Sequence, residues 1–457
     1  MGLMPVTDAV FMLPEGREQP MHVGGLQIFD LPAGAGPEYV AEVYHRVLTA
    51  TGLDPAFRRR AYRSALTLGQ WTWVEDRDVD LEHHIRLSAL PRPGRVRELL
   101  ALVSRLHGTL LDRERPLWEA YLIEGLEGDR FAVYTKVHHA MMDGVSATRL
   151  LERSLSTDPE AKSGAPWMPL TDARPPRRAR PGPGLAAVPG LVRGAAGDAL
   201  TLAPRVLRIA ASGAREPAAA LPGQAPRSIL NVPITGSRRF AAQSWPMARL
   251  IGVARAGGVT LNDVVLAMCS SALRDYLIEL EALPDADLIA MTPVSLRQPG
   301  DDGAGNAVAT ILCNLATTEA DPVARLEAVH TSMDLGKAHL RSLSGSQRLV
   351  VSGAVMAPLL LNTVVGIHHV TRPPFNIVIS NVPGPREPLY WNGARLRGMY
   401  PLSIPFAGQA LNITCTSYAD ELHFGLIGCR RAVPRLQRLL IGLENALVDL
   451  ETAFGLG

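Results

Sequence analysis

Apolar and polar positions form helix-like and strand-like patterns on both sides of a segment that has neither pattern. Apolar residues recur at helical spacing over 39–51, 96–111, 261–280 and 434–454, and these segments are predicted to be helices. Short apolar runs predict strands over 23–29, 131–137, 288–293, 375–380 and 411–416. Helices and strands are mixed in both parts of the chain, so the sequence predicts an α/β fold.

A change in composition after about residue 158 separates the two parts. From there to about residue 226 the chain is rich in Pro, Ala, Gly and Arg, with almost no acidic residues after Asp172. We interpret 161–226 as a linker between an N-terminal domain, 1–160, and a C-terminal domain, 227–457. Apolar and arginine residues at helical spacing over 191–211 allow two interpretations, a membrane-contacting helix or a solvated linker.

The length and composition fit two globular domains. The chain has 457 residues, of which 47% are hydrophobic and 20% charged, so it can form a sizeable core. Its 46 Lys and Arg residues nearly balance its 44 Asp and Glu residues, and the charge therefore indicates no nucleic acid partner. The 4 cysteines form no CxxC pair, which argues against a zinc site or a disulfide framework and favours a cytoplasmic setting.

Two segments bear on export and membrane contact. Residues 1–8 lack the basic and apolar regions of a secretory signal, so export is not expected. Residues 349–367 are uncharged and about long enough to cross a bilayer, but Gly353, Pro358 and Asn362 weaken the apolar pattern. We predict a buried or interfacial helix there rather than a membrane span.

The strongest candidate for chemistry is His-His-Ala-Met-Met-Asp-Gly at 138–144. This motif follows the strand predicted over 131–137 and precedes a helical pattern over 145–155. The histidines are therefore expected in a loop where a strand ends. A neutral imidazole there can take a proton from a hydroxyl and return it to a leaving group. Asp143 is close enough to brace the turn or a ring nitrogen, and Gly144 permits a tight turn.

Two other histidine pairs serve as internal comparisons. Neither His83-His84 nor His368-His369 is followed by Asp-Gly at this spacing. The chain also lacks the GxSxG, GxxxxGK[ST] and HExxH patterns, which argues against hydrolase-type acyl-enzyme, P-loop and zinc-protease chemistry. Direct group transfer with histidine as acid and base is the expectation, and a structural loop histidine is the alternative.

The HHxxxDG pattern resembles the acyl-CoA-dependent acyltransferases of the chloramphenicol acetyltransferase and condensation-domain superfamily. Other segments look like the bacterial wax ester synthase/diacylglycerol acyltransferases, and the resemblance covers nearly the whole chain. These segments are Pro-Leu-Trp-Glu at 116–119, Leu-Asn-Asp-Val at 261–264, Pro-Val-Ser-Leu-Arg at 293–297 and Ser-Asn-Val-Pro-Gly-Pro at 380–385. No Asp-Phe-Gly-Trp-Gly is present, which distinguishes the chain from the chloramphenicol acetyltransferases and plant alcohol acyltransferases.

The resemblance implies two chloramphenicol acetyltransferase-like α/β domains with an active-site tunnel between them. By position in the motif, His139 is the expected general base, His138 and Asp143 order the loop, and Gly144 permits its turn. Arg297 is expected to support the site by pairing with Asp143, because a guanidinium fork matches a carboxylate.

Three further segments each have a functional and a structural interpretation. Asn262 and Asp263 are expected to position substrate or an oxyanion, although helix capping after Thr260 explains them about as well. Two other groups are expected to bind the acyl donor, with core packing and an ordinary loop as the respective alternatives. They are Pro116, Leu117 and Trp118, and Asn381, Pro383 and Gly384.

Together, the motif and the resemblance predict an O-acyltransferase that moves a fatty acyl group from long-chain acyl-CoA to the hydroxyl of diacylglycerol or of a long-chain fatty alcohol. The products would be triacylglycerol or wax ester. Acyl-CoA is a substrate, so no cofactor or metal is expected. Lipid substrates suit a cytoplasmic protein bound peripherally to a membrane or lipid droplet. The alternatives are a carrier-protein-dependent acyltransferase and a non-catalytic lipid-binding or lipid-droplet protein.

Overall fold

The computed structural model describes most of the chain. The described residues are 2–50, 52–64, 67, 69–142, 144–169, 220, 223–295, 308–343, 347, 348, 351, 353, 355 and 372–456. Most of the predicted linker and most of the apolar stretch 349–367 lie outside these ranges, and so do Asp143 and Arg297. The predictions made for those segments and for the pairing of Asp143 with Arg297 therefore stay predictions.

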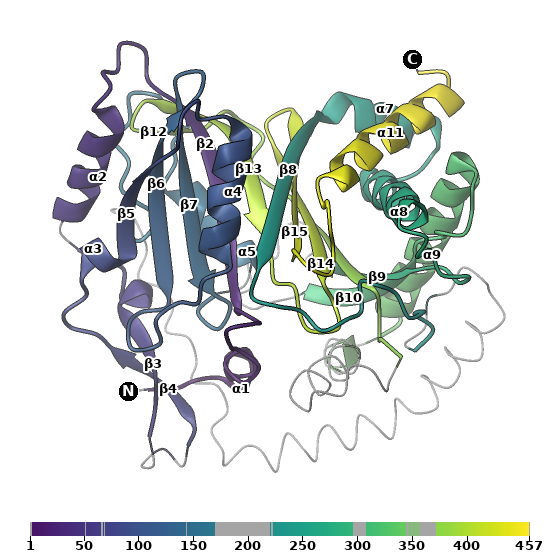
Figure 1. Cartoon of the computed structure of the whole chain (residues 1–457), viewed down its shortest axis with the longest axis horizontal. Coiled ribbons are helices and arrows are strands. Elements are labelled where there is room, and N and C mark those ends of the chain that lie inside the picture. The colour runs from purple at the N-terminus through teal and green to yellow at the C-terminus, as the bar shows by residue number, and fades with distance from the viewer. Residues whose placement is uncertain are drawn as a thin grey trace.

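Two six-stranded sheets lie side by side and form the framework of the molecule (Figure 1). The first sheet has the order β12-β13-β2-β7-β6-β5, in which β5 and β6 are parallel and the other neighbours are antiparallel. Its strands are β2 (His22–Asp30), β5 (Ile85–Ala89), β6 (Trp118–Leu126), β7 (Arg130–His138), β12 (Tyr390–Trp391) and β13 (Ala394–Leu402).

The second sheet has the order β10-β9-β11-β14-β15-β8. β11 runs parallel to both of its neighbours, and the other pairs are antiparallel. Its strands are β8 (Arg238–Pro246), β9 (Ile289–Ser295), β10 (Val308–Asn314), β11 (Ile377–Val382), β14 (Leu411–Tyr418) and β15 (Glu421–Cys429). A small third sheet near the N-terminus contains β1 (Gly2–Leu3), β3 (Arg59–Arg63) and β4 (Trp71–Glu75).

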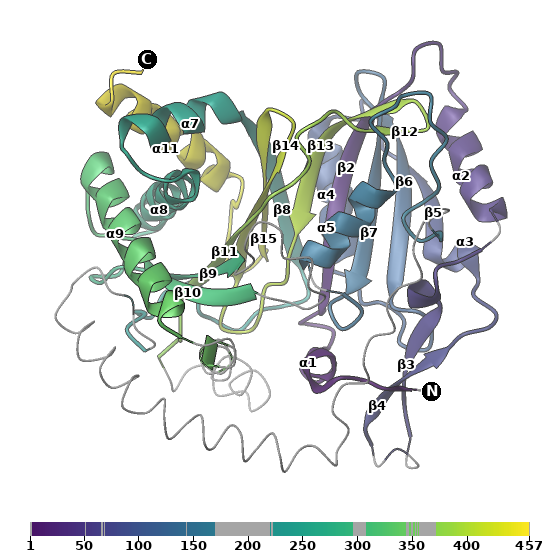
Figure 2. The same ribbon diagram turned by 180° about the vertical axis from the view of Figure 1, so that it is seen from behind.

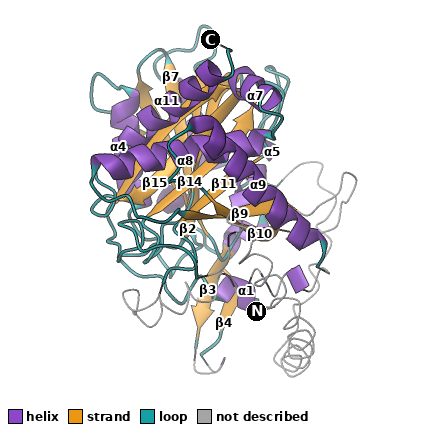
Figure 3. Ribbon diagram, turned by 90° about the vertical axis from the view of Figure 1, so that its right-hand side faces the viewer, coloured by secondary structure: helices purple, strands orange, loops and turns teal. Residues whose placement is uncertain are grey.

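Helices pack on the sheets and bury the apolar residues of the strands. α7, α8, α9 and α11 cover the face of the second sheet that points away from the first sheet (Figure 3). α4 and α5 flank the first sheet on opposite sides, as Figures 1 and 2 show. The helices are α1 (Val6–Ala9), α2 (Tyr39–Thr49), α3 (Leu81–His84), α4 (Val96–His107), α5 (Gly144–Arg153), α7 (Met247–Ala256), α8 (Leu261–Glu279), α9 (Pro322–Arg341) and α11 (Arg438–Ala453), with a short 3-10 helix at Pro55–Arg58.

The C-terminal half of the chain contributes two strands to the first sheet. β12 and β13 come late in the sequence, yet β13 pairs with β2 along its length and places Tyr400 opposite Leu26. The C-terminal half thus supplies strands to both large sheets. The predicted domain bounds, 1–160 and 227–457, stay a prediction. Because β12 and β13 join the first sheet, a cut in the linker does not separate the two sheets.

The predicted helices and strands are confirmed, with shifts at some ends. The helix predicted over 96–111 ends at His107, where the backbone N–H of Gly108 donates to the carbonyls of Ser104 and Arg105 and closes the last turn. The helix predicted over 434–454 begins only at Arg438. Arg435 has a φ of 51°, in the left-handed region, and a right-handed helix cannot run through it.

Within the described ranges, every individual helix is too short or too polar to span a bilayer. α7 and α8 reach the length and hydropathy of a span only as a pair, and the chain bends by 100° between them. Most of α8 is buried in the core of the second half, where Val264, Leu266 and Leu273 are fully covered. This burial is typical of a core helix.

Candidate active site

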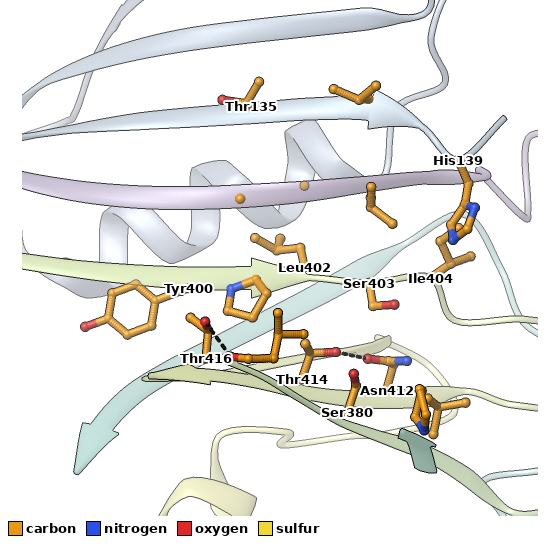
Figure 4. A pocket seen from close by; sticks show the side chains of 18 of the residues that line it. Thr135, His139, Ser380, Tyr400, Leu402, Ser403, Ile404, Asn412, Thr414 and Thr416 are labelled. Carbon is orange, nitrogen blue, oxygen red and sulfur yellow. Dashed lines mark hydrogen bonds between the residues drawn. The ribbon is translucent and has the colours of Figure 1, made fainter. Parts of the chain in front are cut away.

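A cavity of about 420 Å³ lies between the two large sheets. The first sheet contributes β2, β7 and β13 to its wall, the second contributes β9, β10, β11 and β14, and α5 closes part of it with Leu150 and Leu151. Most lining side chains are apolar. The hydroxyl and amide groups among them come from several strands, and β14 supplies Asn412, Thr414 and Thr416. Thr414 donates to the side-chain oxygen of Asn412 over 2.9 Å (Figure 4). This size and lining suit a small organic ligand with a long apolar part.

His139 stands at one end of this cavity and Tyr400 at the other (Figure 4). His139 follows directly on the end of β7. Its backbone N–H donates to the carbonyl of Met21 over 2.9 Å, and this bond extends the pairing of β7 with β2. The half-buried ring of His139 stacks on Phe11, with the ring centroids 3.9 Å apart. Strand pairing and ring stacking together fix the direction in which this imidazole faces the cavity.

His138 does not line the cavity and is fully buried. Its Nδ1 accepts from the backbone N–H of Ala140 over 3.0 Å, so the ring proton sits on Nε2. Nε2 lies 3.2 Å from Oε1 of Glu15. His138 therefore holds the turn after β7 from inside, which supports the predicted role of ordering the loop.

Glu15 is a site residue that the sequence analysis missed. Its side chain is 1% exposed, and its Oε2 accepts from Nε of Arg113 over 2.8 Å. Oε1 also accepts from the backbone N–H of Met21, over 3.3 Å, so the carboxylate contacts both segments that hold His139. Burial raises the pKa of Glu15, but His138 and Arg113 outweigh burial and hold this pKa below its usual 4.5. The only sequence signal was one acidic residue after the apolar run Phe11–Pro14.

The other end of the motif begins a helix. α5 starts at Gly144, directly after the turn, so the first N–H groups of this helix follow closely on His139 in the chain. Asp143 and Arg297 lie outside the described residues. Of the predicted catalytic set, the structure thus brings His138, His139 and the start of α5 at Gly144 into one short segment at the end of the cavity.

The residues Pro116, Leu117 and Trp118 lie behind this segment and do not line the cavity. The carbonyl of Leu117 accepts from the backbone N–H of His138 over 2.9 Å. Trp118 is fully buried, stacks on His84 at 4.5 Å and donates from Nε1 to the carbonyl of Phe57 over 3.0 Å. These contacts favour the packing interpretation over direct contact with the acyl donor.

Replacing Trp118 with alanine is expected to lower the free energy of unfolding by about 3–5 kcal/mol, since the change leaves a large void and an unpaired carbonyl. Urea unfolding followed by circular dichroism measures this loss. The folded fraction should keep the wild-type KM for acyl-CoA. A normal unfolding free energy together with a raised KM would instead indicate that Trp118 contacts the donor.

Asn262 and Asp263 also lie apart from the cavity, at the start of α8. Thr260 and Asp263 form a reciprocal capping box, in which the Asp263 carboxylate accepts from the backbone N–H of Thr260 over 2.9 Å. The same carboxylate lies 2.8 Å from Nδ1 of His330 on α9. The structure thus supports helix capping at Asp263, and the predicted roles of both residues with substrate stay predictions without a contact to support them.

Asn381 lies in the last part of β11, and Pro383 and Gly384 follow the end of this strand. Two residues of this strand, Ser380 and Val382, line the cavity, whereas the three predicted residues do not. Gly384 donates from its N–H to Oγ of Ser417 over 3.0 Å, and a Cβ there would overlap the Ser417 carbonyl oxygen. The lining positions are thus alternate residues along β11, and the predicted role of Asn381, Pro383 and Gly384 in donor binding stays a prediction.

Comparisons with known proteins agree with this architecture. The model of the wax ester synthase/diacylglycerol acyltransferase catalytic domain matches residues 4–265, and that of the C-terminal domain matches 304–451. A putative diacylglycerol O-acyltransferase of Mycobacterium tuberculosis is 51% identical, over 99% of this chain and 100% of its own. The O-acyltransferase WSD of Acinetobacter baylyi is 44% identical, over 96% of this chain and 95% of its own.

Solved structures give the same result. The wax ester synthase/diacylglycerol acyltransferase from Marinobacter aquaeolei is 43% identical over 100% of both chains, with a TM-score of 0.81. The starter condensation domain of rhizomide synthetase is only 14% identical, but its TM-score of 0.56 over 99% of this chain and 94% of its own shows the same fold. The predicted superfamily fold is therefore confirmed. The chain belongs to the wax ester synthase/diacylglycerol acyltransferase family and is an acyltransferase.

Proposed function

We propose that the protein transfers a fatty acyl group from acyl-CoA to the hydroxyl of diacylglycerol, or of a long-chain alcohol, with His139 as general base. The observation that carries this proposal is the position of His139, at the end of an apolar cavity between two sheets. Relatives at 44–51% identity are named as O-acyltransferases, which supports the reaction class. Diacylglycerol, giving triacylglycerol, is the first acceptor that we propose, and a long-chain alcohol, giving wax ester, is the second.

In the proposed reaction, the imidazole of His139 takes the proton of the acceptor hydroxyl while the hydroxyl oxygen attacks the thioester carbonyl carbon. A carbon–oxygen bond forms and the carbon–sulfur bond breaks. His139 then gives the proton to the departing thiolate, so the enzyme returns to its starting state. The stack on Phe11 and the bond to the Met21 carbonyl keep the ring in place during both transfers.

The negative charge that develops on the carbonyl oxygen needs hydrogen-bond donors. The first turn of α5 begins at Gly144 and leaves backbone N–H groups without helical acceptors, which supports this helix as a source of donors. The apolar wall supports binding of the acyl chain. We propose no resident cofactor and no metal, because acyl-CoA already carries the activated acyl group.

Release of coenzyme A thiol by the purified protein tests the proposal. Palmitoyl-CoA is supplied alone, with diolein and with hexadecanol, and the lipid products are separated by thin-layer chromatography. We expect thiol release to depend on the acceptor and to match the ester formed. Release that needs an acylated carrier protein, or lipid binding without any turnover, would contradict the proposal and favour one of the two alternatives.

We also propose that the protein meets its lipid substrates at a membrane or lipid-droplet surface. Diacylglycerol and long-chain alcohols partition into lipid, and this partition supports contact with a surface rather than capture from water. Cosedimentation with vesicles that contain diolein measures the contact. Protein that stays in the supernatant at every vesicle concentration would contradict this part of the proposal.

A further inference from the structure

A second cavity, of about 590 Å³, differs in kind from the apolar one. Every described residue that lines it is charged, polar or glycine. Four of them are arginines, Arg17, Arg105, Arg238 and Arg430, and Glu18 is the one acidic residue among them. The cavity lies where the end of α4, the start of β8 and the segment before β2 meet. Its lining therefore carries a concentrated positive charge in a molecule with a net charge of only +2.

Arg238 is the most unusual member of this group. It is 4% exposed, and its guanidinium donates to the backbone carbonyls of Thr235 and Glu18 but forms no ion pair with any described residue. Burial lowers the pKa of Arg238 to about 10, so the group is still charged at neutral pH. A buried charge without a counterion destabilises a protein, and an anion in the cavity would supply that counterion.

The other three arginines are exposed at the mouth of this cavity. In the part of the chain that the structure describes, the guanidinium groups of Arg17, Arg105 and Arg430 make no ion pair or hydrogen bond, so all three can turn toward a ligand. A Cβ on Gly236 would overlap the Arg17 carbonyl, so only glycine lets these two segments of the wall approach so closely. The backbone of this wall is therefore closely packed, while its four arginines have no acidic partner among the described residues.

The two cavities share a wall at the end of α4. His107 donates from Nε2 to the carbonyl of Ser403, a residue that lines the apolar cavity, while the next residue, Gly108, lines the polar one. A second connection runs through the segment before β2. Glu18 lines the polar cavity, and the chain from Glu18 to Met21 spans at most about 11 Å. The Met21 carbonyl accepts from the backbone N–H of His139 over 2.9 Å.

We propose that the polar cavity binds the phosphate groups of the coenzyme A part of the acyl donor. This inference rests on the proposed use of acyl-CoA. Arginine forks match phosphate oxygens, and the donor needs a site for its phosphates within reach of the reacting thioester. The pantetheine arm, an extended chain between thiol and pyrophosphate, would then run from the arginines past the segment Glu18–Met21, whose last residue contacts the backbone of His139. The polar cavity thus anchors the donor while the apolar cavity holds its acyl chain.

Arg105→Gln and Arg430→Gln test the proposal, because both side chains are exposed and their loss leaves no void. Each change removes a charge-assisted hydrogen bond and is expected to raise the KM for palmitoyl-CoA about tenfold. Arg97→Gln, eight residues earlier on α4, and Arg431→Gln, the neighbour of Arg430, are the matched controls, since both are exposed and outside the cavity. Unchanged KM values in Arg105→Gln and Arg430→Gln would overturn the proposal.

A donor without phosphates separates phosphate binding from a structural effect. S-palmitoyl-pantetheine carries the same thioester, so Arg105→Gln and the wild-type protein should use it with equal kcat/KM. A tenfold loss with this donor as well would overturn the proposal and indicate that Arg105 acts by shaping the wall.

A direct binding measurement tests the phosphate site independently of acyl transfer. Calorimetry with adenosine 3′,5′-bisphosphate, the phosphate-bearing end of the donor without its thiol, is expected to show binding that Arg430→Gln weakens about tenfold. Arginine-dependent binding in a protein without acyl transfer would uphold the phosphate site and contradict the proposed function. Acyl transfer without such binding would uphold the proposed function and overturn the phosphate site.

A lipid headgroup is the other source of phosphate. Vesicles of phosphatidylglycerol separate the two sources, because headgroup binding predicts that Arg105→Gln and Arg430→Gln reduce cosedimentation and leave the KM for palmitoyl-CoA unchanged. That result would overturn the assignment to coenzyme A. A raised KM with unchanged cosedimentation supports it.

Discussion

Replacing His139 with alanine is expected to lower kcat for acyl transfer by about a hundred- to ten-thousand-fold, the usual contribution of a positioned general base. The ring lines the cavity at the end of β7, and it is the only histidine among the described residues that line it. The backbone contact of residue 139 with Met21 does not need the imidazole, so the fold should survive the change. Thiol release from palmitoyl-CoA with saturating hexadecanol or diolein measures the loss.

His45→Ala is the matched control for this prediction. His45 is exposed on α2, in the same half of the chain, and it is absent from the cavity wall. It should therefore leave kcat unchanged. A folded His139→Ala protein with normal acceptor-dependent turnover would show that the base is another group.

Glu15→Gln is expected to lower kcat about tenfold to hundredfold while the KM for acyl-CoA changes little, because a shift of the catalytic segment by a fraction of an ångström is costly. The amide keeps the size of the side chain but loses the charge that pairs with Arg113. It also presents a weaker acceptor to Nε2 of His138. Glu15 does not line the cavity, so it acts as a positioning residue through His138.

Glu114→Gln is the control for Glu15, because the Glu114 side chain is 88% exposed and its nearest cation, Arg60, lies 3.7 Å away. It should leave both kinetic constants unchanged. Equal kcat values for Glu15→Gln and the wild-type protein would show that the buried pair of Glu15 and His138 does not position His139.

The lowered pKa of Glu15 also predicts how its contribution to stability depends on pH. The folded state holds this pKa below the usual 4.5, so folding is favoured by the ionised form. The contribution is fully present above about pH 4.5 and is lost as the pH falls toward the folded pKa. The difference in Tm between the wild-type protein and Glu15→Gln should thus shrink on acidification below pH 4.5. A difference that grows there would contradict this sign.

Much of the fold could be predicted from local patterns. The helix α8 and the strands β2 and β7 are rich in apolar residues because most of their positions are buried, and such segments are visible in sequence. The placement of β13 could not be predicted. Its pairing with β2 joins residues about 370 positions apart, and no local property of either strand specifies that partner.

In the candidate site, too, some residues could be predicted from the sequence and others could not. His138 and His139 are neighbours in a recognisable motif, so the sequence proposes both, and the resemblance predicts a different role for each. Glu15 and Phe11 reach the same site from a distant segment, through pairing of β2 with β7. The contact of Trp118 with the acyl donor stays a prediction, because burial and donor binding both favour a large aromatic residue next to a strand, and the contacts of Trp118 suit packing.

The late position of β13 has a consequence for synthesis on the ribosome. β2, β7, β6 and β5 leave the ribosome early, but the edge of β2 gains its partner only after Leu402 has been made. Throughout that interval the nascent sheet exposes an unpaired edge that can bind another strand, which favours aggregation. Productive folding of the N-terminal half is therefore tied to completion of translation, and chaperone binding to the edge of β2 would protect the growing chain.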